Sequence, residues 1–196
     1  MAVLWANLRV VLRQNSKSLI NMGVTSKKYI SLPILDLNEI RYVLLTNFIT
    51  PIRVIAIGCN RTIFRTTDGG TNWAISPGNI TANLTSVHFP ASNIGYAVGG
   101  YGTIGKTIDG GSIWNILFSG TLADLSSVYF TDVDTGYAVG TKWGSQGYGT
   151  SYILKTTNGG TNWSVVLIIE SINLFSIYFF NAQTGYTVGH GGILKQ

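Results

Sequence analysis

The stretch TTDGGTNW, residues 66–73, places an acidic residue, two glycines and a tryptophan within eight positions. Near-copies return as TIDGGSIW at 107–114 and TTNGGTNW at 156–163. Carboxylates near glycines can suggest a metal or a phosphate site, but the side chain of Asp or Asn can also accept hydrogen bonds from backbone N–H groups and stabilise a tight turn. Because Asn158 is a poor metal ligand and the stretch recurs, the sequence favours a turn that the fold needs once per unit.

The sequence around this stretch also repeats. A six-residue segment ends in Phe each time, and a glycine-flanked apolar segment begins six residues after that Phe. The first segment occurs as LTSVHF at 84–89, LSSVYF at 125–130 and LFSIYF at 174–179; the second starts at 95, 136 and 185. Alternating apolar and polar residues predict a half-buried strand, and the glycine-flanked segment predicts a strand buried on both faces.

Each unit therefore reads as four short strands, with the Trp-containing turn between the third and the fourth. Repeats of roughly 40 to 50 residues with four strands each indicate β-propeller blades. We predict an all-β fold, an incomplete β-propeller with about 3.5 four-stranded blades. The blades are expected at 43–83, 84–124, 125–173 and, in part, 174–196, after a poorly defined N-terminal segment, 1–42.

The pattern T-x-D-x-G-x-x-W resembles the Asp-box of sialidase-type propellers. The fuller pattern, VYFTDVDTGYAVG at 128–140 followed by ILKTTNGGTNW at 153–163, resembles the photosystem II stability and assembly factor family of BNR, or Asp-box, repeat propellers. The resemblance covers about residues 43–196. It implies the propeller fold and a non-catalytic role in binding a protein partner, and its exported members favour an extracytoplasmic location.

The repeated residues are interpreted as structural: Asp or Asn accepts hydrogen bonds, glycine supplies the backbone angles and Trp packs on the hairpin. These Asp-box residues are Thr66, Asp68, Gly70, Trp73, Thr107, Asp109, Gly111, Trp114, Thr156, Asn158, Gly160 and Trp163. One departure from the period stands out, the insertion KWGSQGYGTS at 142–151. We expect a Gly-rich loop there, with Trp143 and Tyr148 as partner-binding residues.

Composition narrows the function classes. The net charge of +5 comes from residues 1–61, with eight basic and two acidic residues; residues 62–196 hold five basic and six acidic ones. The repeated region thus lacks a basic face, so we expect no nucleic-acid partner. No apolar run is long enough for a transmembrane segment.

DVDTG at 132–136 has the alternating carboxylates of a calcium loop, but the equivalent loops lack them, so we expect no metal and no cofactor. Both His88 and His190 are expected on the surface.

Three functions remain open. The leading hypothesis is a protein-binding or assembly-factor-like module without catalysis. The second is a fragment of a sialidase-like glycoside hydrolase or a carbohydrate-binding propeller; hydrolysis generally needs two carboxyl groups across the scissile bond. The chain has only Glu39 and Glu170 as glutamates, and its last Arg is Arg65, which disfavours this chemistry. The third is a truncated propeller without independent function.

Overall fold

The computed structural model describes residues 43–50, 53–58, 61–144, 149–190 and 192–195; the predicted N-terminal segment 1–42 lies outside them. Within these ranges the chain forms β-strands and one short 3₁₀ turn, η1 (Gly100–Gly102). The strands form four antiparallel sheets, three of four strands and one of three. Within each sheet the strands lie in chain order, as in a meander.

The strand bounds follow the repeats. The first sheet contains β1 (Val43–Thr50), β2 (Arg53–Gly58), β3 (Ile63–Thr66) and β4 (Ala74–Ile75). The second contains β5 (Leu84–His88), β6 (Gly95–Gly99), β7 (Ile104–Thr107) and β8 (Asn115–Leu117). The third contains β9 (Asp124–Phe130), β10 (Gly136–Trp143), β11 (Gly149–Thr156) and β12 (Ser164–Glu170). The fourth contains β13 (Leu174–Asn181), β14 (Thr184–Gly189) and β15 (Gly192–Lys195).

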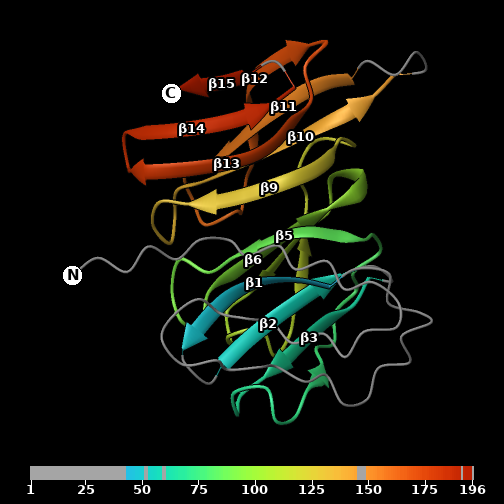
Figure 1. Ribbon diagram of the computed structural model, residues 1–196, viewed down its shortest axis with the longest axis vertical. Helices are drawn as coiled ribbons and strands as arrows, with labels where there is room; N and C mark the ends of the chain where they lie inside the picture. Colours follow the sequence, from blue (N-terminus) through green and yellow to red (C-terminus); the bar gives the residue numbers. More distant parts are fainter. Residues whose placement is uncertain (1–42, 51–52, 59–60, 145–148, 191, 196) are drawn as a thin grey trace.

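Consecutive sheets are neighbours in space. Figure 1 shows them following one another from the blue first sheet to the red fourth sheet. Contacts between sheets run through their first strands, with β5 against β1 and β9, and β9 against β13. The second strands β6 and β10 are buried through their glycine-flanked segments, as the sequence predicts.

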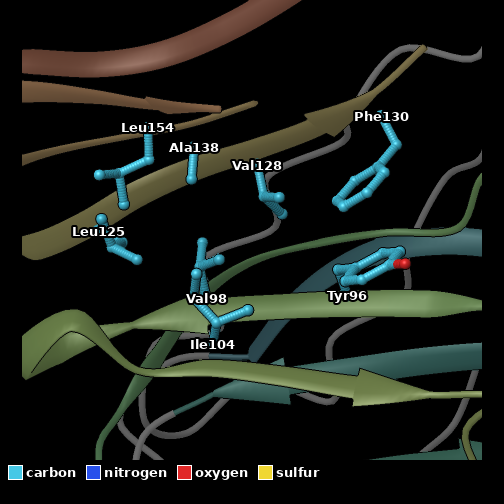
Figure 2. Packing of buried hydrophobic residues seen from close by; sticks show 8 residues of the cluster. All are labelled: Tyr96, Val98, Ile104, Leu125, Val128, Phe130, Ala138 and Leu154. Atoms are coloured by element: carbon cyan, nitrogen blue, oxygen red, sulfur yellow. The ribbon is translucent and has the colours of Figure 1, made fainter. Parts of the chain in front are cut away.

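Aromatic stacking joins the sheets. Tyr96 of β6 lies parallel to Phe130 of β9, with ring centroids 3.7 Å apart and an interplanar angle of 11° (Figure 2). Val98 and Ile104 of the second sheet extend this contact against Leu125 of the third. Burying large apolar side chains from two sheets against each other is the main stabilising term in such a stack.

A recurring glycine in the second strand permits the close approach of the backbone at the start of the first strand. A Cβ at Gly140 would lie 2.4 Å from the carbonyl oxygen of Asp124, and one at Gly99 would lie 2.0 Å from that of Asn83. Both contacts are shorter than any real Cβ makes with backbone. The recurring glycine therefore marks the place where the linker enters the first strand of the same sheet.

The insertion at 142–151 differs from the prediction. Among its described residues, 142–143 and 149–151 extend both strands of the hairpin: β10 runs to Trp143 and β11 begins at Gly149, which pairs with Trp143. Consecutive residues continue the ladder, with Lys142 opposite Thr150 and Trp143 opposite Gly149. Trp143 is thus a strand-end residue, and Tyr148 lies outside the described residues.

Candidate functional site

The three Asp-box turns share one set of hydrogen bonds. In the first, the Thr66 hydroxyl donates to Asp68 Oδ1 at 2.7 Å and accepts the Gly70 N–H at 2.9 Å. In the second, Thr107 donates to Asp109 Oδ1 at 2.7 Å and accepts the Gly111 N–H at 2.9 Å. The glycines at the centre have positive φ angles, for example +71° at Gly69. Only glycine adopts such angles without steric cost, which explains the GG pair.

The carboxylates are held by backbone N–H groups of their own turns. Asp68 Oδ1 accepts the N–H of Asn72 at 2.9 Å, and this bond is the largest cause that lowers the pKa of Asp68 to about 2. Partial burial acts to raise the pKa of Asp109, but hydrogen bonds from Ile113, Thr107 and Ser112 outweigh it and lower the pKa below its ordinary value. Both groups are therefore ionised acceptors at neutral pH.

The third turn makes the same bonds without a charge. Asn158 Oδ1 accepts the Thr156 hydroxyl at 3.0 Å and the Asn162 N–H at 2.9 Å. The Gly160 N–H donates to Thr156 at 3.0 Å, as in the other two copies. An amide oxygen replaces a carboxylate oxygen with the geometry intact, so the turn needs an acceptor and does not need a negative charge.

The Asp-box tryptophans are buried to different extents. Trp114 is 2% exposed and packs edge-on against Phe89, with ring centroids 6.0 Å apart. Trp163 is partly buried and makes a similar edge contact with Phe130 at 5.8 Å. Trp73 is also partly buried. Of the three, Trp114 is enclosed most completely, in the core between the first and second sheets.

The other end of the second sheet carries an apolar surface that the sequence reasoning missed. Its members are Tyr101 in η1 and Phe118 and Leu122 in the linker to β9, which are 78%, 87% and 71% exposed. We call these three residues the linker-end surface. The signal in the sequence was present: all three large apolar residues lie between strands, where the strand periodicity does not require them.

The backbone under this surface is fixed by contacts between the η1 turn and the linker. The Gly102 N–H donates to the Ala123 carbonyl at 2.8 Å, and the Tyr101 N–H donates to Asp124 Oδ1 at 2.9 Å. Tyr101 has a φ angle of 55°, in the left-handed region that non-glycine residues seldom occupy. The two segments are therefore held together, and Tyr101 projects into solvent from a defined turn.

Trp143, the partner-binding residue expected from the sequence, lies at the same end of its own sheet. It is 54% exposed at the end of β10, opposite the Asp-box end of that strand, where Gly136 pairs with Thr156. In the third sheet, Trp143 therefore lies at the end that corresponds to the linker-end surface of the second sheet.

The other polar candidates are engaged in local structure. Asp132 of the DVDTG segment accepts the N–H groups of Thr135 and Asp134 at 2.7 and 2.8 Å. The bond from Thr135 is the largest cause of the lowered pKa of Asp132. Among the described residues no three His, Cys, Asp or Glu side chains gather as a metal site would require. No described helix has the length and apolar character that a membrane span requires.

The surface position expected for His88 is wrong. The ring is partly buried between the second and third sheets, 4.5 Å from that of Tyr129, and its Nδ1 accepts the Phe130 N–H at 3.3 Å. Alternation does place His88 away from the core of its own sheet, but the next sheet covers that face. Burial lowers the pKa of His88 to about 4. His190 is exposed, as expected, beside Phe175.

His88 predicts an acid-sensitive fold. Because its pKa is lower in the folded chain than the usual 6.5, the unfolded chain binds the proton more tightly, and stability falls as the pH drops from 6.5 towards 4. Part of the ring remains accessible, so we expect a loss of about 1–2 kcal/mol between pH 7 and pH 5. Urea unfolding at both pH values measures it. His88→Tyr, which copies Tyr129 of the third sheet, should remove this contribution; an unchanged pH dependence would contradict the assignment.

Solved structures of known proteins share this fold. The structure is similar to an ancestral GH74 enzyme, with a TM-score of 0.63 and 18% identity over 81% of this chain and 22% of the enzyme. It is also similar to the GH74 xyloglucanase of Xanthomonas campestris, with a TM-score of 0.59 and 14% identity over 80% and 28% of the two chains. The chain folds as an incomplete β-propeller with four-stranded blades. The predicted fold class is confirmed.

Assembly-factor structures also appear among the similar proteins. YCF48 bound to a D1 peptide matches with a TM-score of 0.36 and 13% identity over 79% of this chain and 77% of that chain. That score is too low to establish a common arrangement of the blades. No protein-family model matches the sequence, and no curated protein is detectably similar. The propeller chain spans only about a quarter of the GH74 enzymes it matches, and identities this low concern the fold alone.

Proposed function

We propose that this propeller chain is a non-catalytic module that binds a protein partner, in an extracytoplasmic setting, through its linker-end surface. The observation that carries the proposal is the exposure of Tyr101, Phe118 and Leu122 together on one turn and linker. Large apolar side chains gathered on ordered loops are typical of protein-binding surfaces. Trp143 at the same end of the neighbouring sheet would extend the contact.

The carboxylates support a structural role for the Asp-boxes. A glycosidase uses a general acid with a raised pKa, whereas the pKa values of Asp68, Asp109 and Asp132 are lowered by hydrogen bonds. The third turn keeps its geometry with Asn158 in place of Asp. We therefore assign the twelve Asp-box residues to turn formation. The same proposal takes 43–83, 84–124, 125–173 and 174–196 as the blades, without a cofactor or a nucleic-acid ligand.

The test is site-specific photo-crosslinking of the full chain in extracts from its source cells. We expect defined protein adducts that decrease at least about tenfold in the Tyr101→Ser/Phe118→Ser/Leu122→Ser variant, since an apolar anchor commonly contributes more than about 1.4 kcal/mol. The matched control is Ile75→Ser/Ile108→Ser, which removes two side chains of similar exposure that lie away from the linker end. An equal loss of crosslinked adducts in both variants would contradict the assignment of partner binding to the linker-end surface.

A second assay addresses catalysis. The purified chain is incubated with xyloglucan, other β-glucans and sialosides, and released sugars are quantified. We expect no turnover above the buffer control. Turnover that disappears when a described carboxylate such as Glu170 is replaced would favour the glycan-active alternative; sugar binding at Tyr101 and Phe118 without turnover would favour a carbohydrate-binding propeller.

A further inference from the structure

The outer strand of the third sheet is longer than the outer strands of the first two sheets. β12 contains seven residues, whereas β8 contains three and β4 contains two. The insertion at 142–151 supports the extra length, because Ile169 and Glu170 of β12 pair with Ser151 and Thr150 of the lengthened β11. The departure from the repeat therefore builds a long sheet edge, which the proposed function does not use.

This edge has no strand beside it among the described residues, where β12 pairs with β11 alone. An edge strand directs unpaired N–H and C=O groups away from its sheet, and these groups can pair with another strand. Proteins commonly block such edges by shortening the strand or by placing Pro or Lys in it. β4 and β8 are short, but residues 165–169 of β12, VVLII, contain neither Pro nor a charged residue.

The backbone of β12 is regular over the part that the insertion supports. Its one irregularity lies at Val166, and the register with β11 is continuous from Leu167 to Glu170. Leu167 and Ile168 are 45% and 56% exposed. Because successive side chains of a regular strand point to opposite faces, apolar groups are exposed on both faces here. A strand that pairs with β12 must therefore offer apolar side chains on both of its own faces.

A second copy of β12 meets this requirement, since it carries the same apolar run. The single charge of the strand selects the direction of pairing. In a parallel pair in register, Glu170 would lie beside Glu170 of the other copy, and like charges at such positions are destabilising. In an antiparallel pair centred on Leu167, each Glu170 lies opposite the uncharged Ser164 of the other copy. An antiparallel pair of identical strands has two-fold symmetry, so the assembly closes at two copies.

We propose that two copies of this chain pair their β12 strands antiparallel and so join their third sheets into one continuous sheet. The role of the insertion is then to build the edge through which the dimer forms. This edge contains none of the linker-end residues, so the dimer and the proposed binding of a protein partner can fail independently.

The first test is sedimentation of the full chain at concentrations from about 1 to 100 µM, the range in which moderate affinities are measured. We expect a dimer at the upper end of this range. Leu167→Lys should weaken the dimer at least about tenfold, because it places a charge between the paired strands. The matched control is Ile116→Lys in β8, where the side chain is 42% exposed, close to the 45% of Leu167.

The control variant should dimerise like the unchanged chain, and both variants should keep its melting temperature, since both side chains are exposed. A chain that stays monomeric up to about 100 µM would overturn the proposal and leave the edge to another segment of the chain or to another protein. Equal weakening by Leu167→Lys and Ile116→Lys would contradict the role of β12. Assemblies larger than a dimer would contradict closure by two-fold symmetry.

The second test reads the direction of pairing from disulfide crosslinks between copies, in a chain whose own cysteine is removed by Cys59→Ser. Directly opposed side chains of paired strands have Cβ atoms about 4.5–5.5 Å apart, near the separation that a disulfide bridges. We expect oxidation to crosslink Leu167→Cys or Ile168→Cys and to leave Glu170→Cys uncrosslinked. Crosslinking at Glu170→Cys would show parallel pairing and overturn the antiparallel dimer, as would its absence at both Leu167→Cys and Ile168→Cys.

Discussion

Replacing Trp114 with alanine is expected to lower the free energy of unfolding by about 3–5 kcal/mol, the range for large side chains removed from a core. Trp114 is 2% exposed and packs between Phe89 and the hairpin that carries it. Its removal leaves a cavity beside Ile55 and Ile63 that the close-packed sheets cannot fill without moving. Urea unfolding followed by circular dichroism measures the loss.

Two companion variants make the Trp114 prediction specific. Trp73→Ala removes the equivalent indole from a partly exposed position and should cost clearly less. Trp114→Phe keeps a ring but deletes a buried N–H that has no hydrogen-bond partner among the described residues, so it should recover much of the lost stability. If Trp73→Ala and Trp114→Ala were equally destabilising, burial would not be the reason.

Gly140→Ala is expected to destabilise the chain by roughly 3 kcal/mol, at the upper end of what overpacking costs. The added methyl group would lie 2.4 Å from the Asp124 carbonyl oxygen and 2.7 Å from the Leu125 Cα, and neither backbone atom can rotate away. The strand would have to separate from the start of β9, which also contacts the second sheet. Thermal unfolding measures the effect.

The control for Gly140→Ala is Gly120→Ala. Gly120 has a φ angle of +76°, and apart from its two chain neighbours no described residue lies within 4 Å of the position that the alanine methyl group would take, so alanine there meets backbone strain without a clash. Such strain costs about 1–2 kcal/mol. A larger loss at Gly120 than at Gly140 would show that backbone conformation outweighs the close approach.

The repeats made much of the fold predictable. The Phe-ending segments gave β5, β9 and β13, and the glycine-flanked segments gave β6, β10 and β14, because each strand keeps the same neighbours from sheet to sheet. The Asp-box turns were also predictable, because their hydrogen bonds join residues only two to four positions apart. Interactions this local can be recognised from the short stretch of sequence that makes them.

Contacts between sheets were less accessible from the sequence. The alternation that placed His88 on an outer face holds within its own sheet, but it could not reveal that Tyr129 covers that face. The extension of β10 to Trp143 was missed because glycines and polar residues in the insertion resemble a loop. Tyr101 and Phe118 could be noticed in the sequence as large apolar residues between strands, but only the fold shows that the turn and the linker lie together.

Every hydrogen-bonded ladder described above closes within a single sheet. Neighbouring sheets are joined by side-chain packing and a few individual hydrogen bonds. Each sheet is therefore a cooperative unit that is coupled to its nearest neighbours. A pulling force applied between the two ends should therefore extract one sheet at a time. The force–extension trace would show successive rips, each releasing the length of one sheet.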